Sequence, residues 1–219
     1  MGDVRMEVMG SREEWLKRRS TFIGGSDAAA VLGINPWLDN LTLWKIKTGQ
    51  KKQADIADNA AVQFGINAEP HLRALFALDF PQYKVEYVEN NIWFNSDYPF
   101  SHCSADGWLT DKDGRLGVLE IKTTNILQSM QNEKWRDEHI PDNYFCQICH
   151  AMAVMGAEFA VVFAHLRYDY GDKPHFSIKP YFFERADHEE DIAYLMEKEK
   201  EFARYIMEKK QPPRILPTI

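Results

Sequence analysis

The spacing of apolar positions changes along the chain, from a helical period at the N-terminal end to an alternating, strand-like period further on. Ser11 with Glu14 three residues later is the capping-box pattern that opens a helix. Gly33 and Gly49 stand where helices are expected to stop, because glycine readily adopts the left-handed conformation that ends a helix. The first quarter is therefore expected to hold helices over residues 11–19, 26–32 and 35–46.

The remaining chain mixes both periods. Residues 67–78 repeat apolar positions at helical spacing, with Pro70 tolerated in a first turn. Alternation and turn residues then predict strands over residues 84–88, 91–94, 101–110, 116–123, 159–168 and 176–184. Further helices are expected over residues 141–155, ending at Gly156, and over residues 187–209. This order predicts an α/β fold with a central sheet flanked by helices.

Length and composition fit one domain. The 219 residues are 45% hydrophobic, and no low-complexity linker divides them. We expect a single domain over 1–219, with a core of about 60–185, a helical N-terminal part of about 11–50 and a C-terminal helix of about 187–209. The longest apolar run, residues 159–164, is too short to cross a bilayer, which indicates a soluble, cytoplasmic protein without a membrane partner.

The cysteines and the charged residues limit the kinds of site and surface that the chain can form. Three cysteines suit a reducing compartment, and Cys146 and Cys149 are expected to be core thiols rather than metal ligands. The net charge is −7, and seven acids against two lysines between Asp187 and Glu201 assign most of it to a solvated face of the last helix. Local basic surface is expected at residues 17–19 and at Lys45, Lys47, Lys51 and Lys52.

One predicted hairpin gathers chemically useful side chains. A turn centred on Asp113 places Asp106 opposite Glu120 in an antiparallel pair. Because side chains alternate along a strand, Glu120 and Lys122 point to the same face. Two carboxylates and an ammonium group therefore meet on one small patch.

Two close carboxylates repel each other and need a cation to stay ionised. Acids without histidine suit Mg²⁺, or Mn²⁺, better than zinc. Lys122 beside such an ion could orient or help to deprotonate water and balance charge on a phosphate, so phosphodiester hydrolysis is the reaction indicated. The alternative is a turn at Asp106 and an ordinary ion pair of Glu120 and Lys122 on a solvated strand.

Five ordered segments resemble the YqaJ-like viral recombinase family, the family of bacteriophage lambda exonuclease within the PD-(D/E)xK nuclease superfamily. They are Trp15–Arg19 with Ile23–Asp27, Gly65–Glu69, Cys103–Gly107, Leu119–Lys122 and Tyr144–His150. The similarity runs from about residue 15 to residue 166, although the proline of the superfamily name has no clear place before Asp106. The resemblance implies a restriction-endonuclease-like core with a mixed central sheet and a helical N-terminal segment.

The resemblance also assigns the metal site. Asp106 and Glu120 would bind Mg²⁺ together with the backbone carbonyl of Ile121, and Lys122 would act on the water. Glu69 matches a helical acid that the family adds to this site. By itself, Glu69 is equally an exposed acid at the start of a helix, where the helix dipole favours it.

The resemblance to the family implies roles for three further residues. Gln147 would lie beside the active site as part of the catalytic group, with a structural amide as the alternative and neighbouring His150 a packing residue. Arg19 and Ser26 match positions that bind the 5′-phosphate of a DNA end. A helix capped by Ser26 would offer free amides and a favourable dipole to an anion, and Gly24 would allow close approach. The alternative is a capped helix beside a surface arginine. Trp37, Trp44 and Trp108 are expected to be core residues, with DNA wedges or stacking surfaces as the alternative.

The function implied is a Mg²⁺-dependent 5′-to-3′ exonuclease on linear double-stranded DNA, which leaves 3′ single strands for phage-type recombination. Its partners would be DNA ends, two further copies in a trimeric ring and a single-strand annealing protein, in a bacterial host of a phage or prophage. The alternatives are a structure-specific endonuclease and a non-catalytic DNA-binding or assembly protein. Relatives with a four-cysteine iron-sulfur site are excluded by the three cysteines.

Overall fold

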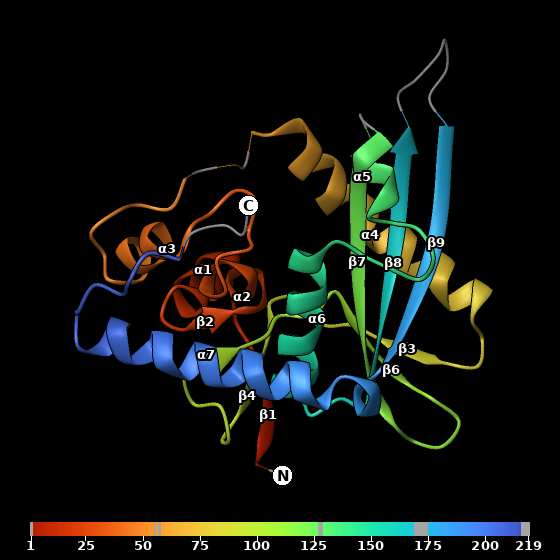
Figure 1. Cartoon of the computed structure of the whole chain (residues 1–219). Coiled ribbons are helices and arrows are strands. Elements are labelled where there is room, and N and C mark those ends of the chain that lie inside the picture. Colours follow the sequence, from red (N-terminus) through yellow and green to blue (C-terminus); the bar gives the residue numbers. More distant parts are fainter. Residues whose placement is uncertain (1, 55, 57, 127–128, 169–174, 216–219) are drawn as a thin grey trace.

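A computed structural model of the chain shows a five-stranded mixed sheet with helices on both faces (Figure 1). The structure describes residues 2–54, 56, 58–126, 129–168 and 175–215. In spatial order the strands are β3 (Lys84–Glu86), β6 (Gly107–Thr110), β7 (Leu116–Ile126), β8 (Phe159–Tyr168) and β9 (His175–Glu184). Strands β7 and β8 are parallel, and the other neighbours are antiparallel.

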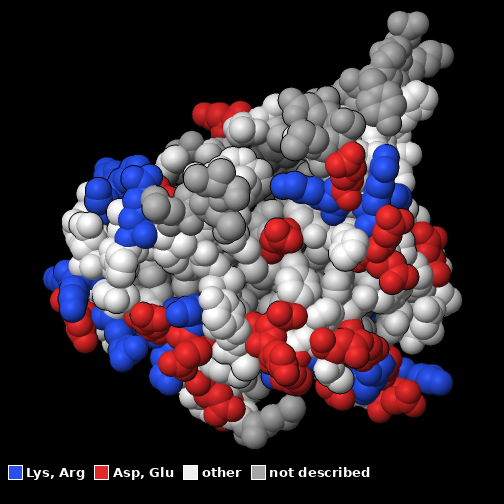
Figure 2. Space-filling view, viewed as in Figure 1, with Lys and Arg blue, Asp and Glu red and all other residues white. Residues whose placement is uncertain are grey.

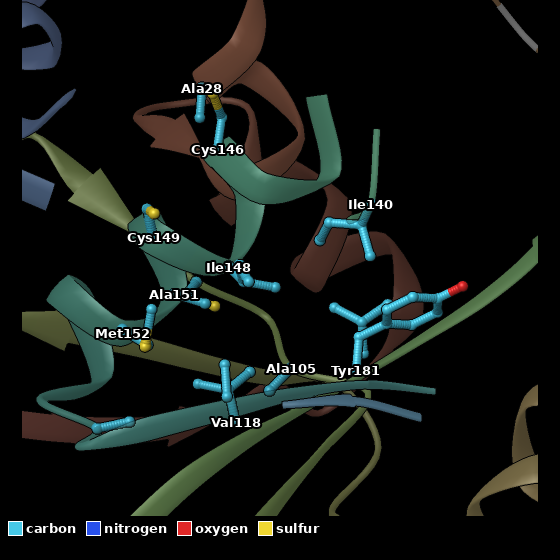
Figure 3. Packing of buried hydrophobic residues seen from close by; sticks show 14 of the residues in the cluster. Ala28, Ala105, Val118, Ile140, Cys146, Ile148, Cys149, Ala151, Met152 and Tyr181 are labelled. Carbon is cyan, nitrogen blue, oxygen red and sulfur yellow. The ribbon is translucent and has the colours of Figure 1, made fainter. Parts of the chain in front are cut away.

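Strands β7 and β8 lie at the centre and are covered on both faces. Helix α4 (Ala60–Asp79) packs on one face, where Phe76 meets Phe163 of β8. Helix α6 (Asp142–Met155) packs on the other face, with Val118 and Val162 in the same cluster as its buried residues (Figure 3). Burial of both faces explains the nearly continuous apolar sequence of β8.

The N-terminal helices form a second body beside α6. The body contains α1 (Arg12–Arg19), α2 (Gly25–Val31) and α3 (Asn40–Lys47), and both α2 and α3 pack against the final helix, α7 (Glu189–Met207) (Figure 1). Their cluster includes Ile23, Leu43 and Trp44 with Phe202 of α7. Two short sheets attach this body to the rest: β1 (Val4–Val8) with β4 (Asn91–Asn95), and β2 (Ile23–Gly24) with β5 (Ser101–His102).

Most predicted elements are present, and the glycines mark their ends. Gly33, Gly49, Gly114 and Gly156 all have positive φ, as expected of helix stops and of the hairpin turn. The predicted start of α3 is wrong. Asn35 instead closes a turn by accepting the amides of residues 37 and 38, and the helix begins at Asn40 with Asp39 as its cap.

Helix α4 is longer than its sequence pattern predicts. It begins at Ala60, capped by Asn59, so that Pro70 lies in its interior instead of its first turn. The first turns escaped prediction because Phe64 and Ile66 face solvent and give no apolar stripe. As a consequence Glu69 is a mid-helix residue, and its interpretation as an acid at a helix start is wrong.

Several short elements also depart from the expectations. The strand predicted over residues 101–110 is divided into β5 and β6, while β1, β2 and α5 (Ser129–Glu133) were not predicted. The acids of the final helix are mostly exposed, as expected, but Glu199 is fully buried. All three cysteines are free and buried, and Figure 3 shows Cys146 and Cys149 inside the core, as expected. Among the helices that the structure describes, none is both long and apolar enough to span a membrane.

Candidate active site at the edge of β7

The hairpin of β6 and β7 has the predicted register. Gly107 pairs with Leu119, so Asp106, one residue before β6, lies level with Glu120. Within the described residues, β6 pairs with residues 116–119 of β7 only. The next part of β7 therefore has an open edge, and Asp106 stands at its start.

Asp106 is anchored to that open edge. Its Oδ2 accepts a hydrogen bond from the backbone N–H of Ile121 at 2.8 Å. In a strand, the N–H and C=O groups of one residue point to the same side, so the carbonyl of Ile121 also points toward Asp106. Two oxygen donors, a carboxylate and a carbonyl, are thus held side by side.

Glu120 and Lys122 point to the α6 face, where Gln147 meets them. Glu120 is 3% exposed, and its Oε1 accepts hydrogen bonds at 2.6 Å from both Lys122 Nζ and Gln147 Nε2. Lys122 Nζ also donates to Gln147 Oε1 at 3.0 Å and lies 4.8 Å from the centre of the Tyr144 ring. The structure thus brings Gln147 into contact with both predicted catalytic groups of β7.

The charges in this group are strongly coupled. Burial, followed by the negative charge of Asp106, raises the pKa of Glu120, while Lys122 opposes the rise. Burial acts to lower the pKa of Lys122, but the carboxylates of Glu120 and Asp106 outweigh it and the pKa is raised. Lys122 is therefore an ammonium ion here, able to orient water and to face an anionic phosphate.

Glu69 reaches the same site from α4 through an arginine that the sequence analysis missed. Arg73 donates to Glu69 Oε1 at 2.7 Å and, through Nε, to the backbone carbonyl of Asp106 at 2.5 Å. Its guanidinium also lies 3.6 Å from the centre of the Tyr87 ring. Burial and the charge of Asp106 raise the pKa of Glu69. The i, i+4 spacing of Glu69 and Arg73 was visible in the sequence, but such pairs usually lie on exposed helix surfaces.

The donor set suits a hard divalent cation. Among the described residues, no cluster of three His, Cys, Asp or Glu side chains stands ready-made for a metal ion. Within the part of the chain that the structure describes, each of the three carboxylates accepts hydrogen bonds through one oxygen only: Asp106 from Ile121 N, Glu120 from Lys122 and Gln147, and Glu69 from Arg73. A site with few carboxylates, completed by water and phosphate oxygens, matches the preference of Mg²⁺. The raised pKa values of Glu69 and Glu120 show that more positive charge would favour their ionised forms.

Arg19 lies near these acids although it belongs to α1. Burial lowers the pKa of its guanidinium, against the charges of nearby groups that include Asp106 and Glu120. The guanidinium carbon lies 4.1 Å from the centre of the Trp15 ring. Within the described residues, no hydrogen bond or ion pair of this guanidinium is present, so its donors are available to an anion.

Ser26 is not the helix cap that the sequence suggested. The N-cap of α2 is Gly24, whose N–H donates to Asp27 Oδ2 at 2.9 Å, and Ser26 lies exposed in the first turn. A Cβ added to Gly24 would stand 2.9 Å from His102 Cε1. The glycine thus permits close packing of protein against protein. Lys47, predicted as basic surface, is instead only partly exposed, and its ammonium group is paired with Asp27 at 2.7 Å.

The remaining candidates divide between core and surface. His150 is fully buried and hydrogen-bonded within the protein, as expected of a packing residue. Trp44 and Trp108 are core residues, again as expected. Trp37 is 74% exposed, so its expected core position is wrong.

A comparison with known families agrees with this geometry. The model of the YqaJ-like viral recombinase domain matches residues 14–158. The chain belongs to the YqaJ-like viral recombinase family. Another YqaJ-like protein, the uncharacterized protein YqaJ of Bacillus subtilis (strain 168), is 34% identical over 164 residues. That match covers 73% of this chain and 49% of the relative, so the chain spans about half of that protein's length.

Solved structures show the same fold. The alkaline exonuclease LHK-Exo from Laribacter hongkongensis superposes with a TM-score of 0.59 at 20% identity, covering 90% of this chain and 97% of that one. Its complex with dAMP gives a TM-score of 0.58 at the same identity and coverage. The expected α/β fold, with a central mixed sheet flanked by helices, is thereby confirmed for this YqaJ-like chain.

Proposed function

We propose that this protein is a Mg²⁺-dependent nuclease that hydrolyses phosphodiester bonds of double-stranded DNA. The observation that carries the proposal is the meeting of Asp106, Glu120 and Lys122 at the open edge of β7. Membership of the YqaJ-like family and the fold shared with an alkaline exonuclease support it. A catalytically silent protein that keeps the fold would be free to lose an acid or the lysine, and all of them are present.

The residues have distinct tasks in this reaction. Asp106, Glu120 and the Ile121 carbonyl would hold Mg²⁺, with Glu69 as a further acid; Mn²⁺ fits the same oxygen donors. When bound, the ion supplies Lewis-acid activation of the phosphate and of a water molecule. The ammonium group of Lys122, steadied by Gln147, orients the attacking water and balances the charge that grows on the phosphate oxygens.

Arg19 and Ser26 are the residues that would set the direction of digestion, by binding the 5′-phosphate of the DNA end. A 5′-phosphate at the start of α2 would accept hydrogen bonds from the guanidinium of Arg19, from the hydroxyl of Ser26 and from first-turn amides of the helix. Pairing with Lys47 already neutralises Asp27, the acid of that turn. We therefore propose 5′-to-3′ digestion of linear duplexes, which leaves 3′ single strands for phage-type recombination.

Assembly is part of the proposal. Figure 2 shows mostly acidic side chains along α7, with some basic ones among them, and a group of basic side chains near α3, which is a mixed surface on a chain of net charge −7. Enclosure of DNA in a ring of three copies would reduce the need for an overall basic surface. A single-strand annealing protein is the proposed partner for the product. A monomer in gel filtration with light scattering would contradict the ring.

One assay tests the reaction and its direction together. The substrates are linear duplex DNA with a 5′-phosphate, the same DNA with a 5′-hydroxyl, and closed circles, each with Mg²⁺ or with chelator. We expect Mg²⁺-dependent degradation of linear DNA, fastest with the 5′-phosphate, and intact circles. Cutting of circles would identify an endonuclease instead.

A further inference from the structure

A chain of buried polar groups connects α7 with β5. Glu199 of α7 and His150 of α6 are both fully buried, with Glu199 Oε1 2.7 Å from His150 Nδ1. The other carboxylate oxygen accepts a hydrogen bond from Ser101 Oγ at 2.6 Å. His150 Nε2 donates to the backbone carbonyl of His102 at 2.7 Å. Two helices thus hold both residues of the short strand β5.

The hydrogen-bond partners determine the charge of His150. A carboxylate and a carbonyl only accept hydrogen bonds, so both ring nitrogens of His150 must carry protons. Burial acts to lower the pKa of His150, but the negative charge and the hydrogen bond of Glu199 outweigh it and raise the pKa. His150 and Glu199 therefore form a fully buried ion pair.

The chain continues from β5 to Arg19. His102 Nε2 lies 2.9 Å from the backbone carbonyl of Arg19, the last residue of α1, and must donate to it. In addition, His102 pairs with Gly24 between β5 and β2, immediately before α2. The backbone positions of Arg19 and of the start of α2 thus both depend on where His102 lies.

We infer that Glu199 and His150 are positioning residues that fix Arg19 for the 5′-phosphate of a DNA end. An apolar pair could fill the same space without the cost of burying two charges, so a buried ion pair gives little stability by itself. The hydrogen bonds of this ion pair are directional, however, so they hold β5 in one position. The inference rests on the proposed function, in which Arg19 binds that phosphate.

The test compares Glu199→Gln with the unchanged protein on 5′-phosphorylated and 5′-hydroxyl linear duplexes. The readout is the ratio of the two kcat/KM values, which does not depend on the fraction of folded protein. We expect this ratio to fall about 10- to 100-fold toward that of Arg19→Gln, because misplacement by about 1 Å can cost that much. Glu197→Gln, which removes an exposed acid of the same helix, should leave the ratio unchanged.

A second arm shows whether Glu199 acts through Arg19. In an Arg19→Gln background, Glu199→Gln should lower the ratio no further, and a further independent fall would overturn the inference. If Glu199→Gln does not fold, Ser101→Ala removes one bond of the chain and should give a smaller fall; an unchanged ratio there overturns the inference.

Failure of the inference is distinguishable from failure of the proposed function. If the unchanged protein shows no preference for the 5′-phosphate, the proposed role of Arg19 fails and the inference fails with it. If the preference is present and Glu199→Gln retains it, only the positioning role is lost.

Discussion

Arg73 and Glu69 lie one helical turn apart on α4, and the guanidinium donates a hydrogen bond to the carboxylate at 2.7 Å. The same guanidinium donates to the backbone carbonyl of Asp106, the first acid of the hairpin. One side chain therefore ties the helical acid to the strand acid. This link explains how α4 and the open edge of β7 can act as a single site.

Arg73→Gln is expected to weaken metal binding more than catalysis. Loss of the two contacts frees Glu69 and the backbone before β6, and residues that orient ligands typically contribute about 10- to 100-fold in metal affinity or activity. We expect the Mg²⁺ concentration for half-maximal activity to rise by that factor, with kcat largely restored at high Mg²⁺. Arg115→Gln, which breaks surface ion pairs at the far end of the hairpin, is the control. A fall in kcat that saturating Mg²⁺ cannot restore would contradict this role.

Lys122→Ala should nearly abolish cleavage while leaving DNA binding intact. The ammonium group is held against Glu120 and Gln147, and removal of one charge-stabilising donor typically costs about 10²- to 10³-fold in rate. Single-turnover digestion measures the chemical step, and fluorescence anisotropy measures binding. Lys84→Ala, at an exposed lysine of β3, should digest at the parental rate. A Lys122→Ala protein as fast as the parent would refute the assignment.

Mg²⁺ should raise the unfolding temperature of the protein, and Asp106→Asn should remove most of that effect. A ligand that binds only the folded state, at about 100 times its dissociation constant, adds about 2.7 kcal/mol of stability. Asparagine can still accept the hydrogen bond from Ile121 N, so the substitution removes charge with little change of shape. Differential scanning fluorimetry with and without Mg²⁺ gives the shift. Asp113→Asn, in the exposed hairpin turn, should keep the full shift; equal shifts in both variants would place the ion elsewhere.

The hairpin is the part of the site that sequence reasoning predicted best. Strand alternation and the turn at Gly114 are local properties, and together they correctly placed Asp106 level with Glu120. Gln147 needed the family resemblance, because nothing local places α6 over β7. Arg73 was missed because its partner carbonyl, at Asp106, lies 33 positions away in the sequence.

The errors concern contacts that form only when the chain folds. Glu199 has the sequence context of a solvated acid on a charged helix, but two partners far away in the sequence, His150 and Ser101, satisfy its buried carboxylate. Lys47 was predicted as basic surface, but in the fold its ammonium group is paired with Asp27. Helix α4 began earlier than predicted because its first turns expose Phe64, so burial gives no pattern there. In each case the tertiary partner, and not the local sequence, decides the outcome.

His102 should make the protein less stable in acid. Burial lowers the pKa of this imidazole to about 3, from an ordinary value near 6.5. Between these values the unfolded chain binds a proton that the folded chain does not, so stability is full above about pH 6.5 and falls as the pH drops. His102→Gln, which can still donate to the Arg19 carbonyl, should remove about one proton from this dependence, or about 1.4 kcal/mol per pH unit.

Urea unfolding from pH 7 to pH 4 measures the slope, with His71→Gln at an exposed histidine as the control. His150, whose pKa is raised in the fold, adds the same pH dependence to His102→Gln and to the parent, so the difference between their slopes reports on His102. Identical slopes for His102→Gln and the parent would mean that His102 is not held neutral in the fold.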